Sequence, residues 1–167
     1  MHSNKELIEK LYTSFQKLDW RGMQSCYHED VIFYDPVFED LDAPKTRAMW
    51  QMLCQQAKDF SLQFNRVEAD SEYGSCHWKA TYTFSKTNRK VVNRVKSHFK
   101  FHEGKIVEHM DDFDLYVWSR QALGVKGWVL GWSSFVKNKI RKMAKSNLER
   151  FITVNNVIHS DSIENYK

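Results

Sequence analysis

The chain is poor in residues that interrupt regular structure. Its 167 residues include only two prolines and six glycines, and no Ser-rich or Gln-rich tract, which argues against flexible linkers and low-complexity segments. Cysteine is scarce as well. Cys26, Cys54 and Cys76 are an odd number with no CxxC pair, so they favour buried reduced thiols over a disulfide framework or a zinc site. Reduced thiols are typical of a cytoplasmic protein, which is the predicted location.

Long apolar runs are also missing. Residues 5–9 are largely charged and no apolar stretch precedes them, so we expect neither a signal peptide nor a spanning helix. With 42% hydrophobic and 14% aromatic residues, the chain can still bury one substantial core, and its length fits one domain. The net charge of +4 is uneven, because residues 115–151 hold eight Lys or Arg against the single acid Glu149.

Two helices are predicted near the N-terminus. Ser3 and Glu6 form a capping box, and apolar residues follow them at helical spacing. Asp19 is placed to cap a second, shorter helix through Met23, because its side-chain oxygen can accept from amides that the helix leaves free. We expect the polar residues 28–30 to end this second helix.

A strand and a third helix follow. Residues 31–34 are apolar and β-branched or aromatic, and they predict a strand that stops before Pro36, since proline lacks the amide donor that a ladder needs. Asp42 and Pro44 mark the start of the third helix, whose apolar positions extend to Phe60.

Between residues 62 and 115 the apolar pattern changes to a period of two. Turn-forming residues interrupt it at 70–75, 86–89 and 102–105, which predicts four antiparallel strands. Alternate residues of a strand share a face, so one face of each strand should border a common interior. The inward residues are predicted to be Trp78, Ala80, Tyr82 and Phe84, then Asn93, Val95, Ser97, Phe99 and Phe101, then His109, Asp111 and Phe113.

Two segments connect this pattern to a known fold. They are residues 27–37, Tyr-His-Glu-Asp-Val-Ile-Phe-Tyr-Asp-Pro-Val, and residues 104–114, Gly-Lys-Ile-Val-Glu-His-Met-Asp-Asp-Phe-Asp. In these two segments and in the order of its predicted helices and strands, the chain resembles the nuclear transport factor 2-like superfamily. This superfamily includes ketosteroid isomerases, limonene epoxide hydrolases and SnoaL-like polyketide cyclases. The resemblance implies an α+β fold in which a cone-shaped, curved antiparallel sheet packs on N-terminal helices, the cystatin-like roll.

The resemblance also suggests how the chain is divided. Residues 1–118 are predicted to form the SnoaL-like cone domain, residues 119–152 a basic helical extension, and residues 153–167 a flexible tail. In the extension, Gly124 ends a short helix, and the almost uncharged residues 127–132 need to be covered by something. A basic helix follows, with one apolar side formed by Phe135, Ile140, Met143, Ala144, Leu148 and Phe151.

The sequence does not decide which surface the extension contacts. Its apolar side could pack over the domain or a second subunit, or its Trp-rich segment and basic helix could rest on an anionic membrane surface. Nucleic-acid binding is not expected, because the basic residues belong to no recognised module. The superfamily resemblance implies a homodimer through the outer sheet face, where the contact would be polar because of Arg94, Lys96, His98 and Lys100.

The resemblance to ketosteroid isomerases gives Asp35, which Pro-Val follows, the role of general base. That role needs a carboxylate near an apolar ligand, within reach of a proton next to a carbonyl. Those enzymes also use a Tyr and a protonated Asp as their oxyanion hole. Leu11 and Ser97 stand at the corresponding positions here, and Tyr12 lies one residue away, about 100° around the helix.

The other two families direct attention to Asp111. The epoxide hydrolase pattern matches only there, because Trp78 and Ala80 stand where an Arg and another Asp are expected. The chain resembles SnoaL-like cyclases around residues 107–111, and in those enzymes an Asp in the cavity is the acid or base of an aldol-type ring closure. The resemblance therefore implies that role for Asp111.

We predict Asp35 and Asp111 as catalytic residues that act without a cofactor. No metal site is expected, since the seven histidines lack ligand spacing. Each carboxylate has a structural alternative. Asp35 could cap backbone amides in a turn beside Pro36, and Asp111 could form a closed pair with His109. The predicted lining of a pocket for a small apolar or aromatic ligand is Tyr12, Trp78, Tyr82, Asn93, Ser97, Phe99, His109 and Phe113.

Two functions follow from these residues. One is a cofactor-independent isomerase or cyclase that acts by proton transfer on a hydrophobic carbonyl compound. The other is a non-catalytic carrier or sensor of a small hydrophobic ligand, in which the carboxylates orient the ligand or stabilise the fold.

Overall fold

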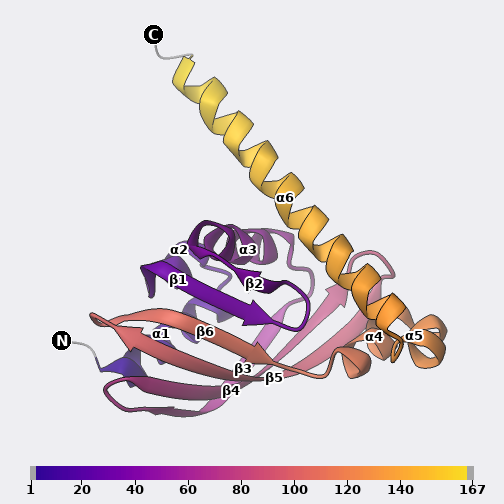
Figure 1. Cartoon of the computed structure of the whole chain (residues 1–167), viewed down its shortest axis with the longest axis horizontal. Coiled ribbons are helices and arrows are strands. Elements are labelled where there is room, and N and C mark those ends of the chain that lie inside the picture. The colour runs from indigo at the N-terminus through magenta and orange to yellow at the C-terminus, as the bar shows by residue number, and fades with distance from the viewer. Residues whose placement is uncertain (1–2, 165–167) are drawn as a thin grey trace.

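The chain forms a curved six-stranded sheet with helices packed against it (Figure 1). The computed structural model describes residues 3–164, with side chains through residue 156. The helices are α1 (Asn4–Gln16), α2 (Trp20–Gln24), α3 (Ala43–Gln56), α4 (Leu115–Leu123), α5 (Val125–Leu130) and α6 (Ser134–Glu164). The strands are β1 (Tyr27–Asp35), β2 (Glu39–Leu41), β3 (Ser61–Ala69), β4 (Tyr73–Phe84), β5 (Arg89–His102) and β6 (Lys105–Asp112).

The strand order is β2-β1-β6-β5-β4-β3. The four strands predicted from the period-two pattern are confirmed as β3 to β6, and they pair antiparallel in sequence order. β1 joins the sheet parallel to β6, so the sheet is mixed rather than wholly antiparallel as predicted. The predicted α+β fold, with a curved sheet packed on N-terminal helices, is confirmed (Figure 1).

Both N-terminal helices begin where they were predicted. Ser3 and Glu6 form the capping box of α1, and the Asp19 side chain accepts from the Gly22 amide at the start of α2. The prediction that residues 28–30 end the second helix was wrong. α2 stops at Gln24, and β1 already begins at Tyr27 because its backbone pairs with β6 at Ile106, a tertiary contact that overrides the polar local sequence.

The third helix has its predicted start but a different end. Asp42 accepts from the Lys45 amide, with Pro44 in the first turn, as the capping pattern indicated. The helix ends at Gln56 rather than at Phe60, which lies in the link to β3 and packs against the core. The short strand β2, between β1 and α3, was not predicted, because three residues carry too little pattern.

The core lies between the sheet and the helices α1 and α3. α1 packs on β3 and β4, and α3 packs on β1. Aromatic rings from both sides meet there, with Phe15 of α1 in contact with Trp50 of α3, Phe60 and Trp78 of β4. This packing fixes the wall of the site described below.

The C-terminal part is helical from Leu115 to Glu164 apart from short links. The predicted short helix before Gly124 is confirmed as α4, and α6 buries Ile140 and Leu148 against the rest of the protein as the apolar-side prediction requires. α6 continues beyond residue 152, where the prediction ended it, and residues 165–167 of the predicted flexible tail lie outside the described residues.

The uncharged residues 127–132 are not covered by the rest of the described chain. Trp128, Val129, Leu130 and Trp132 are exposed, and so is Phe135 at the start of α6, although the prediction placed it on the same side as the buried Ile140 and Leu148. Cover of this segment by a partner stays a prediction. α5 is short and packs on α4 through Gly127, so only one side of it can be buried.

No helix among the described residues is long and apolar enough to cross a bilayer. On the outer sheet face, Arg94, Lys96 and His98 are exposed and Lys100 is half-buried. The homodimer through this face stays a prediction.

Candidate functional site

A cavity of about 310 Å³ lies between the sheet, α3, α4 and α6. Its lining is mainly apolar and aromatic, with few polar side chains. Residues from the sheet and the β1–β2 turn that line it include Phe33, Asp35, Val37, Phe38, Trp78, Ala80, Tyr82, Asn93 and Asp111. Its helical lining includes Met49, Trp50, Met52, Trp118, Ile140, Met143, Ala144 and Asn147. A concave apolar space with a few polar groups is the usual form of a small-molecule site.

Asp35 is the last residue of β1 and borders this cavity. Its Oδ1 accepts from the backbone amides of Val37 at 2.8 Å and Phe38 at 2.5 Å, which is the turn geometry expected of an Asp before proline. Burial raises the pKa of the Asp35 carboxyl from 3.8 to about 7, against the lowering effect of those amides and with a further rise from the Asp111 charge. At neutral pH this carboxyl is therefore present in both protonation states.

Asp111 borders the same cavity from β6. The register of β5 and β6 pairs it with Ser97, and its Oδ1 accepts from the Ser97 hydroxyl. The same oxygen lies 2.8 Å from His109 Nε2, two residues earlier on the same face of β6. Among the described residues no hydrogen bond reaches Oδ2, so both hydrogen bonds to this carboxylate use Oδ1.

The partners of Asp111 form a chain of donors that converges on its carboxylate. The Ser97 hydroxyl donates to Asp111, so Ser97 Oγ accepts from Tyr12 Oη at 2.6 Å and from Trp78 Nε1 at 2.8 Å. On the other side, His109 Nδ1 lies 2.8 Å from Tyr27 Oη. With Nε2–H donating to Asp111, Nδ1 accepts from the Tyr27 hydroxyl, which fixes the tautomer of the imidazole.

Both tyrosines of this chain stay neutral. Burial, followed by the Asp111 charge, raises the pKa of Tyr12 well above 10, and the same two causes raise the pKa of Tyr27. Neutral hydroxyls remain donors, so the network holds Asp111 in one orientation and stabilises its negative charge.

The predicted site residues fall into two layers. Asp35 and Asp111 line the cavity, together with Trp78, Tyr82, Asn93 and Phe113. The four others lie buried behind the cavity wall, where their side chains support the lining rather than form it: Tyr12, Ser97, Phe99 and His109. Tyr12 is therefore not placed to donate to a ligand, since its hydroxyl is used by Ser97.

Tyr82 has a partner that sequence patterns did not indicate. Trp118 of α4 donates from Nε1 to Tyr82 Oη at 2.7 Å, and both residues line the cavity. Within the described residues the Tyr82 hydroxyl proton has no acceptor, so it can donate to a ligand. Burial raises the pKa of Tyr82, against the lowering effect of the hydrogen bond from Trp118 and with a further rise from the Asp35 charge.

α6 closes the cavity and holds the turn that carries Asp35. Ile140, Met143 and Ala144 form part of the lining. Arg141 Nε donates to the carbonyl oxygen of Pro36 at 2.9 Å, and Lys145 pairs with Glu39, whose pKa is lowered mainly by that hydrogen bond. Sequence analysis gave α6 an apolar side and named the domain, a second subunit or a membrane surface as its partner. It did not identify the contacts with Pro36 and Glu39, because contacts across more than a hundred residues leave no local pattern.

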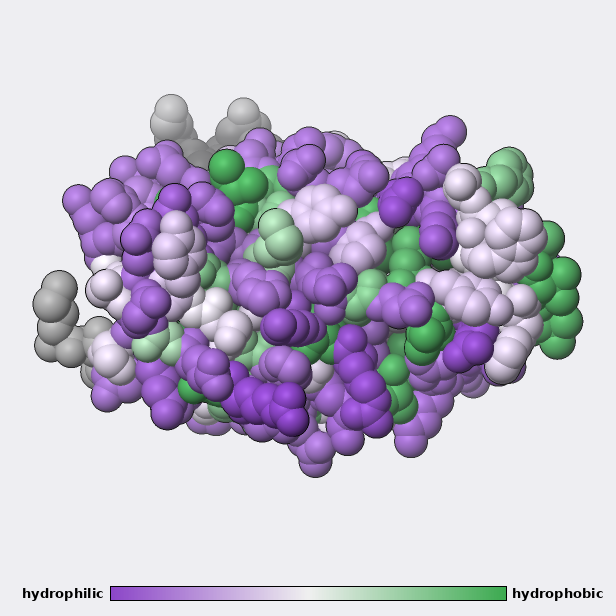
Figure 2. Space-filling model, turned by 60° about the horizontal axis from the view of Figure 1, so that its bottom comes forward, coloured by the Kyte–Doolittle hydropathy of each residue, from purple (hydrophilic) through white to green (hydrophobic). Residues whose placement is uncertain are grey.

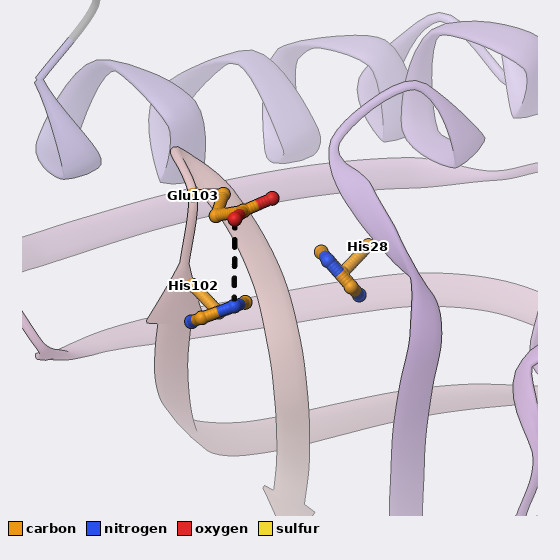
Figure 3. A group of neighbouring side chains, drawn as sticks. All are labelled: His28, His102 and Glu103. Atoms are coloured by element: carbon orange, nitrogen blue, oxygen red, sulfur yellow. Dashed lines mark ion pairs between the residues drawn. The ribbon is translucent and has the colours of Figure 1, made fainter.

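A second group of polar side chains lies on the surface, away from the cavity. Figure 3 shows His28, His102 and Glu103, whose ligand-type atoms all lie within 4.8 Å of one another. The two histidine rings meet edge to face at 5.4 Å, and His102 Nε2 lies 3.9 Å from Glu103 Oε1. Zinc ligands lie about 2 Å from the metal, so these atoms would have to move closer together to bind it. Absence of a metal site stays a prediction.

Solved structures with the same fold come from several bacteria. A candidate polyketide cyclase from Pseudomonas putida KT2440 is 17% identical, with a TM-score of 0.62 over 73% of this chain and 99% of that chain. An LEH-like epoxide hydrolase from M. tuberculosis is 18% identical, with a TM-score of 0.61 over 75% of this chain and 92% of that one. IdmH, a candidate polyketide cyclase from Streptomyces antibioticus, is 19% identical, with a TM-score of 0.62 over 74% and 100%.

At these identities the similarity establishes the fold and no activity. No curated protein matches the chain in sequence. The family model of the SnoaL-like domain matches residues 8–109, a segment that includes β1 with Asp35, all of β3 to β5 and His109. The chain belongs to the SnoaL-like domain family.

Proposed function

We propose that the cavity binds a hydrophobic carbonyl compound and that Asp35 and Asp111 isomerise or cyclise it by proton transfer, without a cofactor. The observation that carries this proposal is the presence of two buried carboxyl groups, in unlike surroundings, on one apolar cavity. Pairs of titratable groups held in different environments are how one site supplies both an acid and a base.

Asp111 is the proposed base. The donors Ser97 and His109 stabilise its charge and occupy Oδ1, which leaves Oδ2 for a proton on the carbon next to the ligand carbonyl. The tyrosines behind them hold the two donors in place. Removal of the proton leaves an enolate, whose negative charge develops on the carbonyl oxygen.

Asp35 and Tyr82 are the proposed partners of that oxygen. With a pKa of about 7, Asp35 is substantially protonated at neutral pH and can donate a hydrogen bond, as the Tyr82 hydroxyl can. A Tyr and a protonated Asp form the oxyanion hole of ketosteroid isomerases. This chain would rebuild that pair from different positions, since Leu11 and Ser97 replace the family's donors.

The enolate then has two outcomes. If the proton returns from Asp111 to another carbon of the conjugated system, the compound is isomerised. If the enolate carbon attacks a second carbonyl of the same molecule, a carbon–carbon bond forms, that carbonyl oxygen takes up a proton, and a ring closes. The shared step is proton removal next to a carbonyl, which the test should measure directly.

Deuterium exchange at the α-carbon of 2-tetralone, followed by proton NMR in D₂O, tests that step without knowledge of the natural substrate. We expect Asp111→Asn to lower the exchange rate by roughly 10²- to 10⁴-fold, and Tyr82→Phe by roughly 10²-fold. Binding, followed by fluorescence of Trp50, Trp78 and Trp118 in the cavity wall, should change little. Asp40→Asn, an exposed carboxylate on β2, is the matched control.

A non-catalytic carrier is the second candidate. It is favoured by the hydrogen bonds that both carboxyl groups make within the fold, since Asp35 caps a turn and Asp111 belongs to a buried hydrogen-bond network. Binding of 2-tetralone with no exchange above the solvent rate between pH 5 and pH 9 would favour the carrier and count against the enzyme.

A further inference from the structure

The end of the molecule that carries α5 presents a cluster of large apolar side chains to solvent (Figure 2). Each of its six members is between 50 and 78% exposed. This α5 patch consists of Val125, Trp128, Val129, Leu130, Trp132 and Phe135. Single exposed apolar residues are ordinary, but six of them within eleven positions mark an interaction surface.

The patch is held in shape from behind rather than formed by loose chain. Gly127 packs so closely on α4 that a Cβ there would lie 2.0 Å from the Ser119 carbonyl oxygen. The Arg120 guanidinium lies over the rings of Tyr116 and Trp128, at 5.1 and 4.3 Å from their centroids. α5 therefore buries one side against α4 and keeps the apolar side outward, so folding of the domain does not account for the exposed residues.

The charged residues of the segment that carries the patch are of one sign. No Asp or Glu occurs between residues 115 and 148, whereas Lys126 on α5 is exposed beside the patch. On α6, Lys139 and Lys142 follow Phe135 by four and seven positions, so they share its helix face, and both are exposed. Apolar and aromatic side chains with lysines on adjacent turns are complementary to an anionic interface.

We propose that the α5 patch docks the protein on the surface of an anionic lipid bilayer. Val129, Leu130 and Phe135 enter the boundary between headgroups and acyl chains, the two tryptophans lie at headgroup level, and Lys126, Lys139 and Lys142 contact lipid phosphates. A second copy of the chain fits this surface less well, because it would bring the same lysines together with no carboxylate to pair them.

The proposal is independent of the chemistry in the cavity. None of the six residues of the α5 patch belongs to the cavity lining. Its test therefore needs no substrate and no activity.

Flotation of the full chain with vesicles provides the measurement. We expect binding to vesicles of equimolar phosphatidylcholine and phosphatidylglycerol, and little binding to phosphatidylcholine alone. Replacing Lys139 and Lys142 together with Gln should lower partition to the anionic vesicles roughly 25-fold, at about fivefold for each cation. Replacing Val129 and Phe135 together with Ser should lower it roughly tenfold or more. Bromine-labelled lipids should quench tryptophan fluorescence in the wild type and less in both variants.

Matched controls separate docking from general stickiness. Ile32 and Met110 are exposed apolar residues on the sheet, so changing both to Ser should leave flotation unaltered. Lys5→Gln with Lys17→Gln, both exposed on the α1 side, controls for total charge. Melting curves show whether each variant folds.

The proposal is overturned if the wild type does not float with anionic vesicles, or if the Val129 and Phe135 variant floats as well as the wild type. If the wild type instead sediments as an oligomer that this variant dissociates, the patch joins two copies of the chain.

Discussion

Replacing Asp35 with asparagine should remove a pH dependence from the stability of the protein. The side chain is buried, and burial raises the pKa of its carboxyl from 3.8 to about 7. The folded protein therefore holds this proton more tightly than the unfolded chain does. Stability supplied by the uncharged carboxyl is present at low pH and is lost as pH rises from 3.8 to about 7.

The size of the effect follows from the two pKa values. A difference of about three units corresponds to about 4 kcal/mol of unfolding free energy over the whole window, of which about 3 kcal/mol is lost between pH 5 and pH 8.5. Asparagine carries no charge, and its amide oxygen can still accept from the amides of Val37 and Phe38. We therefore expect Asp35→Asn to gain about 3 kcal/mol relative to the wild type between these two pH values.

Thermal unfolding at constant ionic strength measures the gain. For a chain of this size, 3 kcal/mol corresponds to roughly 6 to 12 °C in melting temperature. The control Asp40→Asn, on the exposed side of β2, should change stability by less than about 0.5 kcal/mol at either pH. A melting difference between Asp35→Asn and the wild type that stays constant from pH 5 to pH 8.5 would refute the raised pKa, and with it the role of Asp35 as a proton donor at neutral pH.

Three further substitutions test contacts of the site and of the α5 patch by chemical denaturation. Ser97→Ala should lower the unfolding free energy by about 3 kcal/mol, because the buried donors of Tyr12 and Trp78 lose their shared acceptor. Gly127→Ala should lower the unfolding free energy by about 3 kcal/mol, since its Cβ would meet the Ser119 carbonyl oxygen at 2.0 Å. Gly104→Ala is a contrast to this steric clash, because nothing lies within 4 Å of its Cβ and only the backbone, at φ +73°, opposes the change. Ile140→Ala should lower the unfolding free energy by about 2 to 4 kcal/mol and enlarge the cavity. A loss below about 0.5 kcal/mol in any of the three would contradict the contact named.

The sheet and the two carboxylates could be predicted because their signals are local. Period-two alternation assigned β3 to β6 and placed Asp111 and His109 on one face, where the structure joins them by a 2.8 Å hydrogen bond. The proline after Asp35 ended β1 correctly, and the turn contacts of that carboxyl follow from the same pair.

The rest depends on contacts between distant parts of the chain. Tyr82 and Trp118 are 36 residues apart, and Arg141 meets Pro36 across 105 residues, so no local pattern links either pair. Tyr12 was predicted to line the pocket but does not. Its hydroxyl donates to Ser97 behind the cavity wall, because β5 brings that serine between α1 and β6.

Family position alone does not assign the role of Asp35. In ketosteroid isomerases the matching residue is the base, and a pKa near the working pH suits a general base and a general acid alike. Here the pKa of Asp35 is about 7, and Asp111 accepts hydrogen bonds from Ser97 and His109, so either carboxyl group has surroundings that suit a base. The two assignments predict opposite pH profiles for α-proton exchange. With Asp35 as the donor, the rate falls as pH rises through about 7, and with Asp35 as the base it falls below about 7. The direction of that change in the wild type, and its absence in Asp35→Asn, decides which carboxylate removes the proton.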